Sequence, residues 1–279
     1  MRFNLIGPFE IVADDGSVHL PTTPKVCQTL ALLLSRPGEL VPVDSLIREL
    51  WGDCPPRSAP ATVQTYVHQA RRVLNEHRLA SRGSQPLITR PPGYVLEVDP
   101  EDVDITVFER LVTGARAALE DDRPEAAAHD LGAALSLWRG PVLSNVPAGK
   151  VLEGRIVYLT ELRIRALELR IEAEDRLGRL REVIPELRAL VHDYPLNEWF
   201  HGRLICALHR AGRRAEALEA YQALYRILDT ELGLEPSLEL RRLHAELLHT
   251  GGSGAGPAVS ERRDGRPAVA PLWMASFAV

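Results

Sequence analysis

The chain has 279 residues, of which 45% are hydrophobic and 25% charged, and its formal net charge is −5. These values are typical of globular proteins and exclude collagen-like, wholly disordered and disulfide-stapled chains. The length predicts two domains rather than one or four. Cys27, Cys54 and Cys206 lie far apart, so we expect no disulfide framework and no thiolate metal site. No apolar run reaches membrane-spanning length and no signal peptide is visible, which predicts a cytoplasmic protein without membrane attachment.

Charge is distributed unevenly along the chain. Residues 57–90 carry six arginines against the single acid Glu76, whereas residues 100–250 are acidic overall. A basic segment inside a domain whose charges sum to zero suggests a surface that meets a polyanion. A solvated arginine-rich surface would give the same count, so charge alone leaves both interpretations open.

The first hundred residues predict a small domain of short strands and helices. Turn residues rich in glycine and proline separate the β-type runs, and apolar positions at helical spacing mark the helices. The expected elements, in chain order, are strands over 3–6, 10–12 and 18–20, helices over 24–34, 43–51 and 60–75, and a hairpin over 87–96.

The third expected helix, over 60–75, separates an apolar face from a polar one. Val63, Val67, Ala70 and Leu74 follow i, i+4, i+7 and i+11 spacing and form a narrow apolar stripe. The opposite face gathers amide, hydroxyl, imidazole and guanidinium groups, which bind base edges and phosphates. A merely solvent-facing helix favours i,i+4 Glu–Lys pairs instead, so the pattern favours DNA contact. The polar face consists of Gln64, Thr65, His68, Gln69, Arg71, Arg72 and Asn75.

Strands, three helices and a closing hairpin in this order predict a winged helix-turn-helix. The third helix would enter the major groove. The hairpin, which carries Arg90 near its tip, would contact the neighbouring backbone or minor groove.

The second half of the chain predicts an all-α domain. Thr106 and Glu109 have the spacing of a capping box, which predicts a helix start at Thr106. Gly178-Arg179, Glu182, Ala189 and Leu190 recur 34 positions later as Gly212-Arg213, Glu216, Ala223 and Leu224, and 34 is the tetratricopeptide period. A weaker copy begins at residue 123, and a long helix is expected over 151–177.

The sequence therefore predicts a mainly α chain with a small β component, organised as three segments. They are a winged-helix domain over 1–99, a tetratricopeptide-like domain over 103–249 and a tail over 250–279. The tail begins with a Gly/Ser-rich run and follows no helical or strand period, so we expect it to be disordered.

Five motifs of the first hundred residues are specific enough to compare with a known family. They are Leu5-Ile6-Gly7-Pro8, Leu40-Val41-Pro42-Val43-Asp44-Ser45-Leu46-Ile47, Leu50-Trp51-Gly52, Ala61-Thr62-Val63-Gln64-Thr65-Tyr66-Val67 and Arg90-Pro91-Pro92-Gly93-Tyr94. They resemble the DNA-binding domain of the Streptomyces antibiotic regulatory protein family, which is similar to the OmpR/PhoB winged helix. By this resemblance the recognition positions are Gln64, Thr65, His68, Gln69, Arg71 and Arg72, and the wing arginine is Arg90. Related winged helices often carry a basic residue at the position of Gln69, so their base preference does not transfer to this chain.

Motifs of the second half resemble the bacterial transcriptional activation domain of the same regulators. They include Ala134-Leu135-Ser136-Leu137-Trp138-Arg139-Gly140 and Glu231-Leu232-Gly233-Leu234-Glu235-Pro236. The two resemblances cover about residues 1–249. They imply an activator of secondary-metabolite gene clusters that binds direct repeats of double-stranded DNA near promoters. They also imply self-association on DNA and contact with RNA polymerase holoenzyme, including its sigma factor.

Motifs for catalysis are missing from the sequence. Lys25 and Lys150 are the two lysines, and each is followed by valine, so no P-loop occurs; H-E-x-x-H and G-x-S-x-G are absent as well. We predict a non-enzymatic protein without cofactor or metal. Two alternatives to an activator stay open: a tetratricopeptide adaptor that binds proteins, and a repressor built on the same fold.

Overall fold

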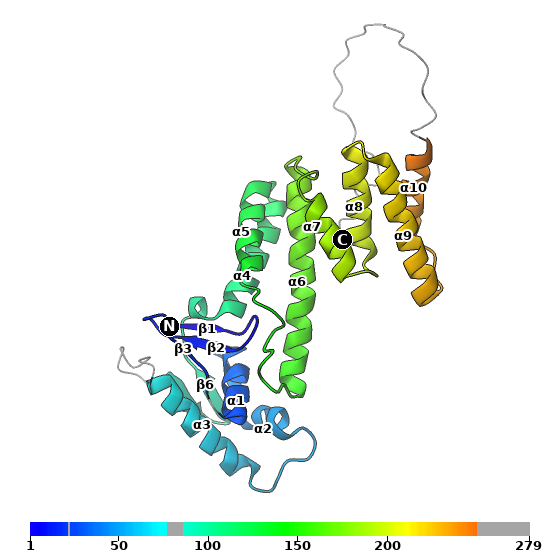
Figure 1. The fold of residues 1–279 in the computed structure, drawn as a ribbon. Helices are drawn as coiled ribbons and strands as arrows, with labels where there is room; N and C mark the ends of the chain where they lie inside the picture. Colours follow the sequence, from blue (N-terminus) through cyan, green and yellow to red (C-terminus); the bar gives the residue numbers. More distant parts are fainter. Residues whose placement is uncertain (22, 77–85, 250–279) are drawn as a thin grey trace, which may run out of the picture. The chain divides into compact units, whose positions relative to one another are not determined.

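The computed structural model describes residues 1–21, 23–76 and 86–249. They are mainly helical, with two small antiparallel sheets, as the sequence predicts (Figure 1). They form two compact units, one over residues 1–173 and one from residue 174 onward. The predicted disordered tail, residues 250–279, lies outside the described residues.

The first sheet joins β1 (Arg2–Asn4), β2 (Glu10–Val12) and β3 (Val18–His19) in that order. The strand expected over 3–6 ends at Asn4, two residues early. The reason is that the N–H groups of Leu5 and Ile6 donate to the carboxylate of Asp104 at 2.8 Å instead of to a neighbouring strand.

The three predicted N-terminal helices and the hairpin are confirmed. The helices are α1 (Pro24–Leu34), α2 (Val43–Trp51) and α3 (Ala59–Glu76). The second sheet has the order β4–β6–β5, with β4 over Leu40–Pro42, β5 over Leu87–Arg90 and β6 over Gly93–Leu96. Gly93 is required at the start of β6, because a Cβ there would lie 2.0 Å from the carbonyl oxygen of Val41.

A helical part follows within the same unit. It contains the 3₁₀ turn η2 (Pro100–Asp102), α4 (Asp104–Glu120), α5 (Pro124–Ser136) and α6 (Lys150–Arg176), of which residues 150–173 belong to this unit. Helix α4 begins two residues before Thr106, so the predicted helix start at Thr106 is wrong. Asp104 stands in the first turn instead, where an acidic side chain is favourable and where it also binds the N–H groups that follow β1.

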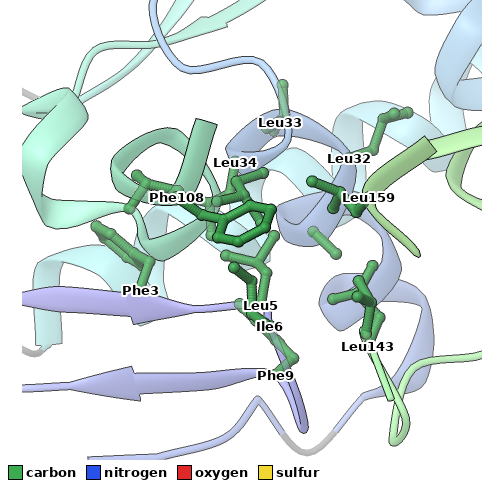
Figure 2. Close-up of a cluster of buried hydrophobic side chains, with 14 of the residues drawn as sticks. Phe3, Leu5, Ile6, Phe9, Leu32, Leu33, Leu34, Phe108, Leu143 and Leu159 are labelled. Carbon is green, nitrogen blue, oxygen red and sulfur yellow. The ribbon is translucent and has the colours of Figure 1, made fainter. Parts of the chain in front are cut away.

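One continuous hydrophobic core connects the winged helix to α4–α6. Figure 2 shows Leu5 and Leu34 of the winged helix packed with Phe108 of α4, near Leu143 and Leu159. All five side chains are almost completely buried. The compact unit therefore continues across residues 99–103, where the sequence places the end of the first domain; the domain limits stay a prediction.

The second unit consists of α7 (Ile184–Asp193), α8 (Glu198–Arg210), α9 (Arg214–Leu232) and α10 (Leu238–His249). Its 34-residue repeat is visible in the backbone. Gly178 and Gly212 have left-handed φ values of 73° and 76°, and the N–H of the arginine after each donates at 2.9 Å to the carbonyl five residues earlier. Both glycines thus end a helix with the same αL turn.

The weaker copy has the same turn without a glycine. Asp122 has φ 55°, and the N–H of Arg123 donates to the carbonyl of Ala118 at 2.8 Å. Aspartate is one of the few residues that tolerate this conformation. The copy predicted from residue 123 is therefore present, with Asp122 in the position that glycine takes in the other two.

Candidate nucleic-acid interface

Helix α3 buries the predicted apolar stripe. Val63, Val67, Ala70 and Leu74 are each at most 1% exposed, and α3 packs through this stripe on α1 and α2 (Figure 1). Trp51 of α2 also stacks on Tyr66 of α3, with ring centroids 6.3 Å apart. These contacts fix the helix in the winged-helix core and leave its opposite face outward.

The predicted polar residues fall into three groups by exposure. Gln64, Thr65, His68 and Arg72 are exposed on the outer face of α3. Gln69 and Arg71 are half-buried at the margin between this face and the core. Arg90 lies at the end of β5, and its side chain is 62% exposed.

Arg71 connects α3 to the hairpin. Its Nε donates to the carbonyl oxygen of Leu87 at 3.0 Å and its Nη2 donates to Thr89 Oγ1 at 2.8 Å. Both acceptors lie on β5. The guanidinium of Arg71 thus holds the wing against the helix, a link to Thr89 that spacing along one helix could not reveal.

Gln69 differs from the exposed residues of the face. Its Oε1 is buried and has no hydrogen-bond partner among the residues that the structure describes. A buried acceptor without a donor is uncommon in folded proteins and is satisfied when a donor or a water molecule reaches it. Gln69 therefore lies at the edge of the outer face, and its Oε1 could accept a hydrogen bond from a molecule that binds there.

The electrostatics of the face favour an anion. Residues 59–75 contain no Asp or Glu, and the exposed Arg57 stands just before the helix. Arg90 pairs with Glu97 at 3.8 Å, but both side chains are more than half exposed, so this pair is weak and easily exchanged for a phosphate. Arg57 and Arg48, which is exposed on α2, were not among the predicted site residues, although the excess of arginine over 57–90 already pointed to the first.

Across residues 1–21, 23–76 and 86–249, no cluster of three or more His, Cys, Asp or Glu side chains is arranged to hold a metal ion. In the same residues no helix has the length and apolar character needed to cross a membrane.

Two family models match the chain, and together they cover most of its described residues. Residues 17–96 match the family described as "Transcriptional regulatory protein, C terminal", and residues 103–248 match the "Bacterial transcriptional activator domain". The chain is 37% identical to the regulatory protein DnrI of Streptomyces peucetius, over 99% of this chain and 100% of the relative. The chain belongs to the Streptomyces antibiotic regulatory protein family of transcriptional activators.

Two further proteins are similar to the chain. The transcriptional regulator RedD of Streptomyces coelicolor is 37% identical over 89% of this chain and 70% of its own length. Among solved structures, Mycobacterium tuberculosis EmbR in complex with a low affinity phosphopeptide matches with a TM-score of 0.81 and 33% identity. That match covers 89% of this chain and 65% of the EmbR chain.

Proposed function

We propose that this chain is a sequence-specific DNA-binding activator of a secondary-metabolite gene cluster. The observation that carries the proposal is the outer face of α3, which presents amide, hydroxyl, imidazole and guanidinium groups and, between residues 59 and 75, no carboxylate. A helix of this kind fits the major groove, where such groups pair with base edges. The chain would act in the cytoplasm on double-stranded DNA of the nucleoid.

The side chains divide the work according to their positions. Gln64, Thr65, His68, Gln69 and Arg72 would share base reading and backbone positioning, and Arg90 would neutralise phosphate or groove potential. Arg71 would add positive potential beside the groove while it holds the wing against α3.

Selection of bound fragments from a random DNA library tests the proposal directly. We expect one enriched sequence that occurs as direct repeats about one helical turn apart, because copies in the same orientation would then lie on one face of the duplex. Recovery of no enriched sequence would refute sequence-specific binding.

Variants separate base reading from phosphate contact. Gln69→Ala should change the preferred sequence, since a good base contact is worth about 1–3 kcal/mol of discrimination. Arg90→Ala should weaken binding to all sequences and reduce the slope of log K against log salt by about 0.9. Arg116→Ala, which removes an exposed arginine of α4, is the matched control for charge. Parental binding by both Gln69→Ala and Arg90→Ala would remove the site assignment.

Activation requires contact with the transcription machinery. We infer that the DNA-bound chain engages RNA polymerase holoenzyme, including its sigma factor, as neighbouring copies on the repeats. Transcription with purified polymerase from a selected promoter should give more transcript when the chain is added. A decrease would instead identify a repressor on the same fold.

A protein-binding adaptor is the second candidate, and one feature favours it. A groove of about 480 Å³ between α7, α8 and α9 is lined by apolar side chains, among them Val191, Leu204 and Ala223, and by charged ones such as Arg188 and Glu219. Grooves of this kind in helical repeats accommodate peptide segments. Retention on a column of random DNA at low salt, with release as the salt concentration rises, supports the activator. Passage through this column at low salt supports the adaptor.

A further inference from the structure

A buried carboxylate joins the winged helix to the helical part of the first unit. Glu49 of α2 is 2% exposed, although it carries a charge. Its Oε1 accepts from the N–H of Gly149 at 2.6 Å and its Oε2 accepts from those of Val151 at 3.0 Å and Leu152 at 2.9 Å. Gln28 of α1 donates to the same Oε1 at 2.8 Å. We refer to these four hydrogen bonds as the Glu49 clasp.

The clasp supplies something that α6 lacks in its own sequence. The first N–H groups of a helix have no intrahelical acceptor, and a side chain at the N-cap usually satisfies those of the second and third residues. Helix α6 begins at Lys150, so the residue before it is Gly149, which has no side chain. Glu49, one hundred residues earlier, accepts from the second and third residues in its place and also sets a negative charge at the positive end of the helix.

The close approach is built into both partners. A Cβ on Gly149 would lie 2.1 Å from the carbonyl oxygen of Glu49, so the two backbones meet only because residue 149 is glycine. The amide of Gln28, itself 2% exposed, donates to this carbonyl oxygen as well. The junction between α2 and α6 is therefore specific and tightly determined.

The clasp is connected to α3, whose outer face carries the candidate interface, through the packing of α2. Trp51, two residues after Glu49 on the same helix, stacks on Tyr66 of α3. Helices α1, α2 and α3 pack on one another, and Gln28 adds α1 to the clasp. A change in the direction of α6 would thus be transmitted to the helix that carries Gln64 and His68.

We propose that Glu49 is a positioning residue that caps α6 from the winged helix and holds α3 and α6 as one rigid body. Its consequence on DNA rests on the proposed function. Copies bound to direct repeats could then keep one spacing, because each would present its helical part in a constant direction relative to the groove that it reads. The clasp itself is a property of the free chain.

The clasp can be tested in the full chain without DNA. Amide hydrogen exchange of the parent should show Val151 and Leu152 protected like residues inside α6, although both belong to its first turn. Glu49→Gln replaces one carboxylate oxygen by an amide NH2 group, which is a donor and cannot accept from the backbone N–H groups. Hydrogen exchange at the amides of Val151 and Leu152 should therefore become about tenfold faster or more. Unprotected Val151 and Leu152 in the parent would overturn the proposal, whether or not the variant folds.

Spin labels test the rigid body. Exposed Asn75 of α3 and Thr160 of α6 would be changed to cysteine in a chain with Cys54→Ser. The distance distribution between them should be narrow in the parent background and broad with Glu49→Gln. Gly149→Ala, which keeps the carboxylate but separates the backbones, should broaden it too. An equally narrow distribution in both variants would overturn the proposal.

A matched control lies between the same two segments. Lys150 and Asp53 form an ion pair at 2.6 Å, but their side chains are 59% and 79% exposed. Asp53→Asn should leave exchange and label distances unchanged, because exposed pairs contribute little. Broadening by Asp53→Asn equal to that by Glu49→Gln would show that any charge at this junction matters, and would remove the special role of the clasp.

DNA-binding measurements on single and paired repeats test the function of the clasp. Glu49→Gln should bind a single repeat within about twofold of the parent and should lose about tenfold of the preference for repeats at the native spacing over repeats shifted by half a turn. Unchanged spacing preference, or equal weakening on single and paired repeats, would overturn the positioning role. If the parent binds no DNA at all, the proposed function fails, while exchange and label distances still decide whether the clasp exists.

Discussion

The carboxylate of Asp104 makes the stability of the first unit depend on pH. Burial raises its pKa from 3.8 to about 6, against the opposing effect of the hydrogen bonds donated by Ile6 and Leu5 and of the nearby Arg139. A carboxyl group with a raised pKa binds a proton more tightly in the folded than in the unfolded chain. Its stabilisation is therefore fully present below the unfolded pKa and is lost as the pH rises through the folded one.

The size of the effect follows from the shift. A change from 3.8 to about 6 corresponds to about 3 kcal/mol in total, of which about 1.3 kcal/mol is lost between roughly pH 5 and pH 7. Asp104→Asn removes the titrating group, and its amide oxygen can still accept from the N–H groups of Leu5 and Ile6. We expect the free energy of unfolding of the parent, relative to that of the variant, to fall by this amount over the same interval.

Urea denaturation of both proteins at several pH values measures this difference. Asp44→Asn, which removes an exposed carboxylate of α2, is the matched control for the loss of one charge. If the unfolding free energy of the parent minus that of the Asp104→Asn variant stays flat or grows with pH, the argument is refuted. Such a result would mean that the accepted hydrogen bonds outweigh burial.

The remaining predictions concern three substitutions and the reactivity of the cysteines. Gly93→Ala should destabilise the chain by about 1–3 kcal/mol, because the new Cβ meets the Val41 carbonyl at 2.0 Å. Gly132→Ala on α5 should stabilise the chain by about 0.5–1 kcal/mol in the same urea titration, because a Cβ at this position would meet no described atom within 4 Å. Equal changes in unfolding free energy for Gly93→Ala and Gly132→Ala would contradict both predictions. A thiol reagent should modify Cys54 alone in the folded chain, since the other two thiols are buried with raised pKa values; reaction of all three would be inconsistent with the fold. Arg71→Ala should lower the free energy of unfolding by about 1–3 kcal/mol and speed proteolysis of the hairpin, because the two hydrogen bonds to β5 are lost. An unchanged rate of proteolysis would show that these hydrogen bonds are dispensable.

Local patterns were sufficient to predict the elements that carry the candidate interface. The apolar stripe of α3 depends only on the spacing of residues within one helix, and its four residues are all buried in the structure. The αL turns at Gly178 and Gly212 are equally local, because a glycine at a fixed interval is all that the turn requires. The sequence therefore predicted the approximate positions of the helices and the repeat, which the structure confirms, whereas the role of the polar face in DNA binding stays a prediction.

Contacts between distant residues could not be predicted in the same way. Leu5 and Ile6 look like a continuation of the first strand, and only the carboxylate of Asp104, some hundred residues later, ends that strand. Glu49 looks like an ordinary polar residue of a short helix, since its partners begin at Gly149. Arg71 has the spacing of a DNA contact but donates to β5. In each case a polar side chain binds backbone groups that no periodic pattern brings near it.

The same distant contacts bear on what counts as the DNA-reading unit. Removing the chain after residue 102 would leave the carboxylate of Glu49 without three of its donors and would expose apolar side chains such as Leu5 and Leu34 that pack around Phe108. Leaving one buried donor or acceptor unmatched costs about 1–3 kcal/mol, and losing the packing around one large core side chain costs about as much again. Since whole domains are stable by only about 5–15 kcal/mol, a winged helix cut at the edge of its sequence match would lose a large part of its stability. The segment proposed to read DNA and the segment that we expect to fold are therefore of different lengths, and the second extends into α6.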